Sequence, residues 1–168
     1  MHLNVEIKAK ARDRATIEAY LKEHNADFRG VDHQVDTYFT VPAGRLKLRE
    51  GNIENSLIFY NRPDQAGPKT SEVHLYHPQE TPKLRAVLSA ALGSWQTVSK
   101  DRAIYFIDNV KFHLDRVEGL GEFIEIEAID ADGSLGQQNI HAQCEHYIKA
   151  FGIKEEDLLE QSYSDLLK

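Results

Sequence analysis

Apolar and polar side chains alternate along much of this chain, which is the period of a β-strand with one apolar face. Residues 3–10 show the alternation strictly, with Leu3, Val5, Ile7 and Ala9 on one side and polar residues on the other. Later segments share this period or are rich in β-branched and aromatic residues, and turn residues separate most of them. These further predicted strands are residues 34–41, 45–49, 56–62, 70–77, 96–107, 110–117 and 122–129.

Apolar residues recur at helical spacing in other segments of the chain. The predicted helices cover residues 13–24, 81–92, 134–151 and 154–167. Asp13 is the expected N-cap of the first helix, and Pro82 lies in the first turn of the second, which Gly93 ends. Eight strands joined mostly by short turns indicate an α+β protein, a closed antiparallel eight-stranded β-barrel with helices packed outside. We expect a single domain over residues 1–168.

The composition narrows the class of protein. The 168 residues include 20 Lys and Arg against 27 Asp and Glu, a net charge of −7, so we expect no nucleic-acid partner. No apolar run approaches the roughly 18 residues of a membrane span, and the polar N-terminal residues do not form a signal peptide. A single cysteine excludes an internal disulfide framework. We therefore expect a cytoplasmic protein with no membrane partner.

Charged side chains share one face of each of several predicted strands. In a single strand this pattern is explained by a charged face in water. When many strands repeat it, the apolar faces need a cover, and helices on the outside would provide one. The charged faces would then line the interior of the barrel. The residues on this face are Glu6, Lys8, Lys10, Arg45, Lys47, Arg49, Tyr60, Arg62, Lys100, Arg102, His113, Asp115, Glu125 and Glu127.

An interior that holds so many cations favours an anionic guest, because the few carboxylates in this set are not expected to neutralise them. Arginine forks and lysine ammonium groups both suit phosphate oxygens. The carboxylates suit Mg²⁺ or Mn²⁺, which proteins commonly bind through one or two carboxylates together with substrate phosphates. The pattern therefore indicates a site for a polyphosphate and a divalent metal.

Several segments resemble the motifs of one family. Residues 4–10 resemble the ExExK signature at the start of the CYTH domain, also called the triphosphate tunnel metalloenzyme fold. Residues 34–49 resemble its second and third strands, residues 114–127 its late acidic segment and residues 162–167 its C-terminal ending. The resemblance covers essentially the whole chain, and it is closest to the class IV adenylyl cyclase branch.

The resemblance implies an eight-stranded antiparallel tunnel that binds triphosphates together with a divalent metal, Mg or Mn. The implied metal ligands are Glu6, Glu125 and Glu127. The implied phosphate-binding residues are Lys8, Lys10, Arg45, Lys47, Arg49, Arg62, Lys100 and Arg102. Catalytic roles are implied for Glu6, Lys8, Arg102 and Asp115.

The resemblance implies the class IV adenylyl cyclase reaction, which converts ATP to cyclic AMP and pyrophosphate. The alternative is a triphosphatase that hydrolyses inorganic triphosphate, thiamine triphosphate or a nucleoside triphosphate. Asn4 stands where the signature has its first acidic residue, and this loss of charge motivates a third hypothesis, a nucleotide or polyphosphate binder without turnover. The expected partner is ATP or another small molecule that contains a triphosphate, and the sequence leaves both a monomer and a homodimer open.

Two other groups of residues have a weaker chemical pattern. His141, Cys144, Glu145 and His146 share one predicted helix, but their spacing matches no standard zinc motif. We interpret them as part of an ordinary amphipathic helix. Trp95 has the ring needed to stack on a nucleobase, but aromatic residues in strands usually serve packing, and we favour that interpretation.

Overall fold

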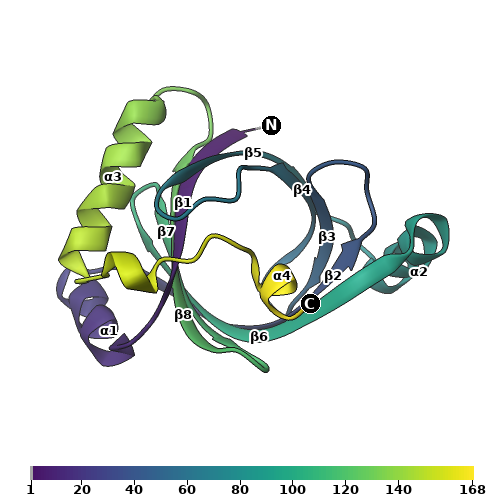
Figure 1. Cartoon of the computed structure of the whole chain (residues 1–168), viewed down its shortest axis with the longest axis horizontal. Coiled ribbons are helices and arrows are strands. Elements are labelled where there is room, and N and C mark those ends of the chain that lie inside the picture. The colour runs from purple at the N-terminus through teal and green to yellow at the C-terminus, as the bar shows by residue number, and fades with distance from the viewer. Residues whose placement is uncertain (1) are drawn as a thin grey trace.

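The computed structural model describes residues 2–168 of the chain. Within these residues the strands form one closed antiparallel barrel in the order β1-β5-β4-β3-β2-β6-β7-β8, and β8 returns to β1 (Figure 1). The strands are β1 (His2–Lys10), β2 (Asp27–Phe39), β3 (Arg45–Glu50), β4 (Asn55–Asn61), β5 (Lys69–Tyr76), β6 (Ser94–Ile107), β7 (Val110–Val117) and β8 (Gly121–Asp130). The α+β class and the closed eight-stranded barrel predicted from the sequence are confirmed.

The helices lie outside the barrel wall (Figure 1). They are α1 (Arg14–Glu23), α2 (Thr81–Leu92), α3 (Gln137–Ala150) and the short α4 (Tyr163–Leu166), and a 3-10 turn covers Glu155–Asp157. Asp13 caps α1 as predicted, because its carboxylate accepts a hydrogen bond from the Thr16 backbone N–H at 3.2 Å. Within residues 2–168, every helix is too short or too polar to cross a membrane.

The main hydrophobic core lies between the outer face of the barrel and the helices α1 and α3. Strands β1, β7 and β8 turn their apolar residues outward, and the helices cover them, as the alternation predicts. Ile17 and Leu21 contribute from α1, and Ile140 and Cys144 from α3. Cys144 is therefore a buried packing residue, in agreement with the interpretation of this helix as amphipathic. The strand residues of this core include Val5, Ile7, Phe112, Leu114, Ile124 and Ile126.

Helix α2 departs from the expectation that each helix covers the barrel. It has no buried residue, and Val87 on it is 64% exposed. Figure 1 places α2 at the far end of the molecule from α1 and α3, at the tip of the long β2–β6 pair. The helix begins at Thr81 with Pro82 in its first turn and ends before Gly93 as predicted, so its local signals are correct although none of its residues is buried.

The predicted helix over residues 154–167 is wrong. After the 3-10 turn, Leu158 forms a β-bridge with Ala9, and the Leu159 backbone N–H donates to the Lys8 carbonyl at 2.9 Å. The segment therefore runs extended along the end of β1 before α4 begins. Tertiary hydrogen bonds to a strand outweigh the local helical preference here.

Strand β2 begins earlier than predicted, at Asp27 instead of residue 34. The first half of β2 contains a register shift between Phe28 and Gly30, and Gly30 has a φ of +108°. A bulge moves the following side chains to the opposite face. The alternation is therefore broken at this point, which is why the sequence pattern hides the first half of the strand.

Candidate active site inside the barrel

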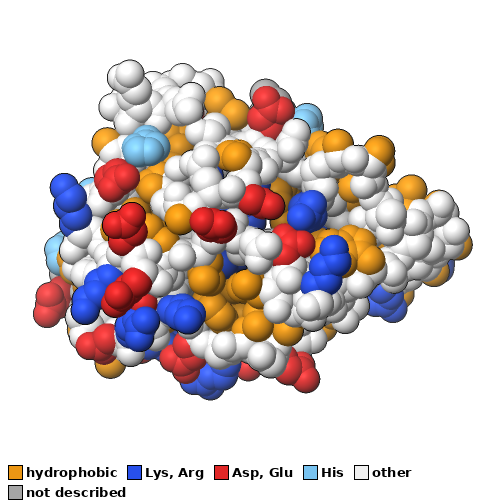
Figure 2. Space-filling view, viewed as in Figure 1, with side chains coloured by type: hydrophobic (Ala, Val, Ile, Leu, Met, Phe, Trp, Pro, Cys, Tyr) orange, Lys and Arg blue, Asp and Glu red, His pale blue; other side chains and the backbone are white. Residues whose placement is uncertain are grey.

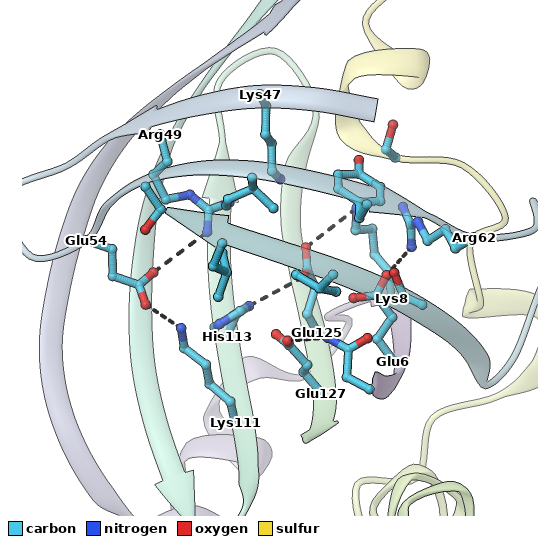
Figure 3. A pocket seen from close by; sticks show the side chains of 18 of the residues that line it. Glu6, Lys8, Lys47, Arg49, Glu54, Arg62, Lys111, His113, Glu125 and Glu127 are labelled. Carbon is cyan, nitrogen blue, oxygen red and sulfur yellow. Dashed lines mark hydrogen bonds and ion pairs between the residues drawn. The ribbon is translucent and has the colours of Figure 1, made fainter. Parts of the chain in front are cut away.

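A cavity lies inside the barrel and receives side chains from all parts of its wall. Most of the residues that the sequence predicted to face inward line it, and Figure 3 shows several of them converging on the same space. The charged residues that line the cavity are Glu6, Lys8, Lys47, Arg49, Glu54, Arg62, Lys100, Arg102, Lys111, Glu125 and Glu127. The side-chain alternation therefore places these cations and carboxylates in one interior.

Asp36 organises three of the cations from behind the cavity wall. It lies in β2 directly opposite Arg49 of β3, and it is fully buried. Its carboxylate accepts hydrogen bonds from Arg49 at 2.9 and 3.0 Å and from Lys100 at 2.9 Å, and the Lys47 ammonium is 3.3 Å away. Burial alone would raise the pKa of Asp36, but these three cations hold it well below its usual value.

Two buried lysines of the cavity have depressed pKa values. Burial is the main cause for both, because it disfavours the charged ammonium, and neighbouring cations add to it. The pKa of Lys8 is lowered to about 8 and that of Lys100 to about 7, although Glu125 and Asp36 oppose the respective shifts. A bound phosphate group would favour the protonated form of each lysine.

Arg102 is fixed by carboxylates on two neighbouring strands. Its guanidinium donates two hydrogen bonds of 2.8 Å to Asp115 and lies 3.3 Å from Glu125. The Tyr163 hydroxyl donates to the same Asp115 carboxylate at 2.8 Å. Asp115 is fully buried and is not among the residues that line the cavity, so it lies behind Arg102. The catalytic role that the resemblance implied for Asp115 stays a prediction.

The implied metal ligands lie together on the neighbouring strands β1 and β8, where Glu6 is directly opposite Glu127. Glu6 accepts a hydrogen bond of 2.5 Å from Arg62, and Glu125 is 3.5 Å from the Lys8 ammonium. Burial raises the pKa of Glu127, and the negative charges of Glu6 and Glu125 add to this effect. A cation placed among these carboxylates would relieve their repulsion.

Asn4 completes this acidic group. Its amide N–H donates to Glu127 at 2.5 Å, and its buried Oδ1 has no hydrogen-bond partner among the described residues. Three carboxylates and one neutral oxygen are hard donors that suit Mg²⁺ or Mn²⁺. No three His, Cys, Asp or Glu side chains of residues 2–168 form a ready-made metal cluster. One or two of these carboxylates would hold a cation together with oxygens of a phosphate substrate.

The sequence analysis missed two charged residues of the wall, Glu54 and Lys111. Glu54 accepts a hydrogen bond from Lys111 and lies 3.7 Å from Arg49, so it links β7 to β3 across the cavity (Figure 3). Both residues could have been found by counting back in twos, from Tyr60 along β4 and from His113 along β7. His113 itself lines the cavity, and burial lowers its pKa to about 4.

The carboxylates of the interior nearly balance its cations. With the buried Asp36 and Asp115, the described chain sets six carboxylates against the seven lysines and arginines that line the cavity. The sequence analysis therefore expected a larger excess of cations over carboxylates in the interior than the structure contains. Two missed carboxylates, Asp36 and Glu54, and the position of Lys10 and Arg45 outside the cavity account for most of the difference.

Lys10 and Arg45 lie outside the cavity although they have the predicted parity. Lys10 is the last residue of β1 and is exposed beyond the end of the bore. Arg45 lies at the rim, where it pairs with Asp165 at 3.1 Å and stands 5.9 Å from the Trp95 ring. The alternation along a strand specifies the face of the sheet on which a residue lies, but not its position along the barrel axis. This is why Lys10 and Arg45 were predicted to lie in the cavity.

The C-terminal segment, residues 158–168, lies across one end of the bore. Ser162 and Tyr163 line the cavity, and the Lys8 ammonium is 3.7 Å from the centre of the Tyr163 ring. Figure 3 shows Lys8, Glu6 and Arg62 on the side of this segment and the Glu54–Lys111 pair on the opposite side. The cavity therefore has one end next to α4 and a second end near Glu54.

The outer face that carries α4 does not share the charge pattern of the interior. On the face that carries α4, Figure 2 shows acidic and basic side chains interspersed rather than a continuous basic patch. On this side of the molecule, the dense clustering of cations with carboxylates is therefore a property of the bore.

This chain is similar in sequence and in fold to proteins of one family. The CYTH domain model matches residues 2–163. A Methanocaldococcus jannaschii protein named as a candidate adenylate cyclase is 27% identical, and the match covers 98% of each chain. A solved Vibrio parahaemolyticus structure with a similar description has a TM-score of 0.80 at 17% identity, over 98% of this chain and 97% of that one.

A Hippeastrum protein, described as a candidate adenylyl cyclase with a dominant triphosphatase activity, shares the fold. Its TM-score is 0.63 at 14% identity, over 99% of this chain and 94% of that one. The family match extends over nearly the whole chain, and the barrel and its charged bore agree with it. This chain belongs to the CYTH domain family.

Proposed function

We propose that this protein is a divalent-metal-dependent enzyme that acts on triphosphates inside the barrel, with the class IV adenylyl cyclase reaction as its leading activity. The observation that carries the proposal is the convergence of seven buried or half-buried Lys and Arg residues, within residues 2–168, on a cavity that also contains Glu6, Glu125 and Glu127. Family membership supports it, because CYTH triphosphate tunnel enzymes depend on divalent metals.

Phosphoryl chemistry requires positioning and stabilisation of developing negative charge more than it requires a covalent nucleophile. In this tunnel Arg49, Lys100 and Arg102 are held in place by buried carboxylates, so they are oriented before a substrate arrives. Mg²⁺ or Mn²⁺ bound by Glu6, Glu125 and Glu127 would neutralise phosphate charge and polarise a phosphoryl oxygen. In the cyclase reaction the ribose 3′-hydroxyl attacks the α-phosphorus of ATP, and pyrophosphate leaves toward the cations.

Hydrolysis of the terminal phosphate is the second candidate. The same cations would stabilise that reaction, and the Hippeastrum protein of similar fold is described with a dominant triphosphatase activity. The two reactions differ in which phosphorus faces the nucleophile. Their products differ too, so one assay separates them.

The test is a product-resolved assay of the purified chain with Mg·ATP, Mn·ATP, tripolyphosphate and thiamine triphosphate. We expect cyclic AMP and pyrophosphate from ATP. Inorganic phosphate without cyclic AMP would instead favour the triphosphatase. Triphosphate binding without any turnover would contradict an enzyme and leave the binder that Asn4 motivates.

The carboxylates are tested by the double variant Glu125→Gln with Glu127→Gln. We expect turnover to fall by about a hundredfold or more, because the metal and Arg102 lose charged partners. The matched control is Glu72→Gln, which changes an exposed carboxylate on the outer face of β5. Turnover unchanged in the double variant would remove both residues from the metal site.

A further inference from the structure

The two ends of the cavity differ in their exposure to solvent. At the end next to α4, the lining residues Ser162 and Tyr163 are 4% and 3% exposed. At the other end, the lining residues include Leu75, which is 47% exposed, and His77, which is also exposed. A ligand therefore reaches the cavity through the end that Leu75 and His77 line, and we call this end the mouth.

Glu54 lies at the mouth. The His77 ring Nδ1 is 3.4 Å from the carbonyl oxygen of Asn55, the residue that follows Glu54. Glu54 lines the cavity, and Figure 3 shows it on the side away from Lys8 and Arg62. A ligand that enters through the mouth passes this carboxylate before it reaches those two cations.

A buried polar pair behind the wall fixes the position of Glu54. Asp32 and Gln34 are both fully buried. The Asp32 carboxylate accepts hydrogen bonds of 2.9 Å from the backbone N–H groups of Ile53 and Glu54. The Gln34 side-chain amide donates to Asp32 at 2.8 Å and to the Glu54 carboxylate at 3.0 Å. Glu54 is therefore held in the wall, unlike a glutamate that moves freely at a surface.

Glu54 neutralises cations that would otherwise be free to bind phosphate at the mouth. The Lys111 ammonium donates a hydrogen bond to it, and the Arg49 guanidinium is 3.7 Å away. Lys111 is directly opposite Glu127 in the sheet, yet its ammonium bonds to Glu54 from the far side of the bore (Figure 3). Burial would raise the pKa of Glu54, but Lys111 and Arg49 hold it well below its usual value, so the carboxylate is ionised at neutral pH.

A phosphate group at the mouth would lie beside a negative charge. Like charges brought together in a partly buried site weaken binding, because little water lies between them to screen the repulsion. Glu54 cannot turn away without breaking its hydrogen bonds to Gln34 and Lys111. An uncharged part of a ligand would not meet this repulsion. The mouth therefore disfavours phosphate, whereas the cations deeper in the bore favour it.

We propose that Glu54 limits the length of the phosphate chain that the barrel binds. A short chain passes wholly into the bore, and the Glu54–Lys111 pair forms again behind it. A long linear polyphosphate leaves phosphate groups in the mouth, beside the Glu54 carboxylate. This inference rests on the proposed function and adds to it a specificity-determining residue.

The test is displacement of radiolabelled inorganic triphosphate, bound with Mg²⁺ on ice, by two unlabelled competitors. One competitor is inorganic triphosphate, and the other is a linear polyphosphate longer than the barrel, with its concentration counted in chains. Glu54→Gln keeps the size of the side chain and removes its charge. We expect the long chain to compete about tenfold better or more in this variant, and triphosphate to change by less than about threefold.

Glu72→Gln on the outer face of β5 is the matched control, and it should change neither competitor. Equal gains for the two competitors in Glu54→Gln, or no gain for the long chain, would overturn the role of Glu54.

The unmodified protein gives a second measurement, which decides if circular dichroism shows that Glu54→Gln does not fold. We expect the long chain to displace the label at least about tenfold less well than triphosphate does. Displacement that is equal for the two competitors would contradict the limit on chain length alone. Failure of the unmodified protein to bind the label would contradict the proposed function itself.

Discussion

At the scale of single residues, the interior of the barrel supplies counter-ions for its own cations. Asp36 contacts Arg49, Lys47 and Lys100, and Asp115 contacts Arg102. Removing one partner of a buried ion pair leaves an uncompensated charge, which costs more than the pair contributes. These two aspartates therefore fix the geometry of the cations that we propose to bind phosphate, and we expect them to stabilise the fold.

Asp36→Asn should destabilise the fold by about 3 kcal/mol or more, because three buried cations lose their shared anion. Urea unfolding measures the change in the free energy of unfolding. The control is Asp101→Asn, whose carboxylate is 52% exposed and pairs with the exposed His33, and it should cost less than about 0.5 kcal/mol. Equal stabilities of the two variants would show that Asp36 is not the anchor of the cluster.

Lys8 and Lys100 should make the proposed triphosphate binding dependent on pH. Their pKa values of about 8 and about 7 leave both partly neutral at pH 8, and a bound anion raises those pKa values. Binding at pH 8 should therefore take up about one proton, and affinity should fall as pH rises from 7 to 9. Calorimetry in buffers of different ionisation enthalpy measures the uptake.

Lys100→Arg provides the comparison for this proton uptake. Arginine stays protonated throughout this range, so the variant should take up fewer protons at pH 8. The substrate's own protonation is the same in both proteins. Identical uptake by the variant and the unmodified chain would argue against a titrating Lys100.

The alternation of side chains along each strand was enough to predict which face of the sheet a residue lies on. Parity placed Lys47, Arg102 and Glu127 in the interior, where they lie. It could not separate Lys10 or Arg45 from them, because both share the face but lie beyond the cavity or at its rim. The pairing of the cations also depends on strand register and on the positions of Asp36, Glu54 and Lys111, which a pattern along one strand does not contain.

At the scale of secondary structure, elements fixed by local signals were predicted from the sequence, whereas segments fixed by tertiary contacts were not. The caps and breakers of α1 and α2 lie where the sequence places them, because their hydrogen bonds are made within a few residues. The segment after residue 154 depends instead on a bridge between Leu158 and the distant Ala9, so it was not predictable from periodicity. The first half of β2 was hidden by the register shift near Gly30.

The cap of α1 gives a direct test at this scale. Asp13→Ala should lower the free energy of unfolding by about 1 kcal/mol, because the Thr16 backbone N–H loses its acceptor. Asp13→Asn should retain most of the stability, since asparagine caps helices about as well as aspartate does. A loss of the same size in both variants would mean that charge, and not the capping hydrogen bond, is responsible.

At the scale of the whole molecule, the barrel gathers seven lysines and arginines, together with their counter-ions, inside a chain whose net charge is −7. A ligand that binds only the folded barrel stabilises it by mass action. Mg²⁺ with tripolyphosphate at about a hundred times its Kd should add about 2.7 kcal/mol, which raises Tm by roughly 5–10 °C for a chain of this size. Calorimetric melting measures this shift.

Sulfate at matched ionic strength is the control for the thermal shift, because it screens charges but cannot span the site. An equal rise of Tm in sulfate would show that general screening, and not a specific triphosphate site, stabilises the fold.

Closure of the barrel has a consequence for how the molecule acquires its site. Glu6 and Lys8 of β1 meet Glu127 and Glu125 only when β8, more than a hundred residues later in the sequence, completes the ring. A chain interrupted after β7 would carry scattered charges with no enclosure to unite them. A polyphosphate would then bind only to a chain whose barrel has closed. Ligand binding and complete folding therefore coincide.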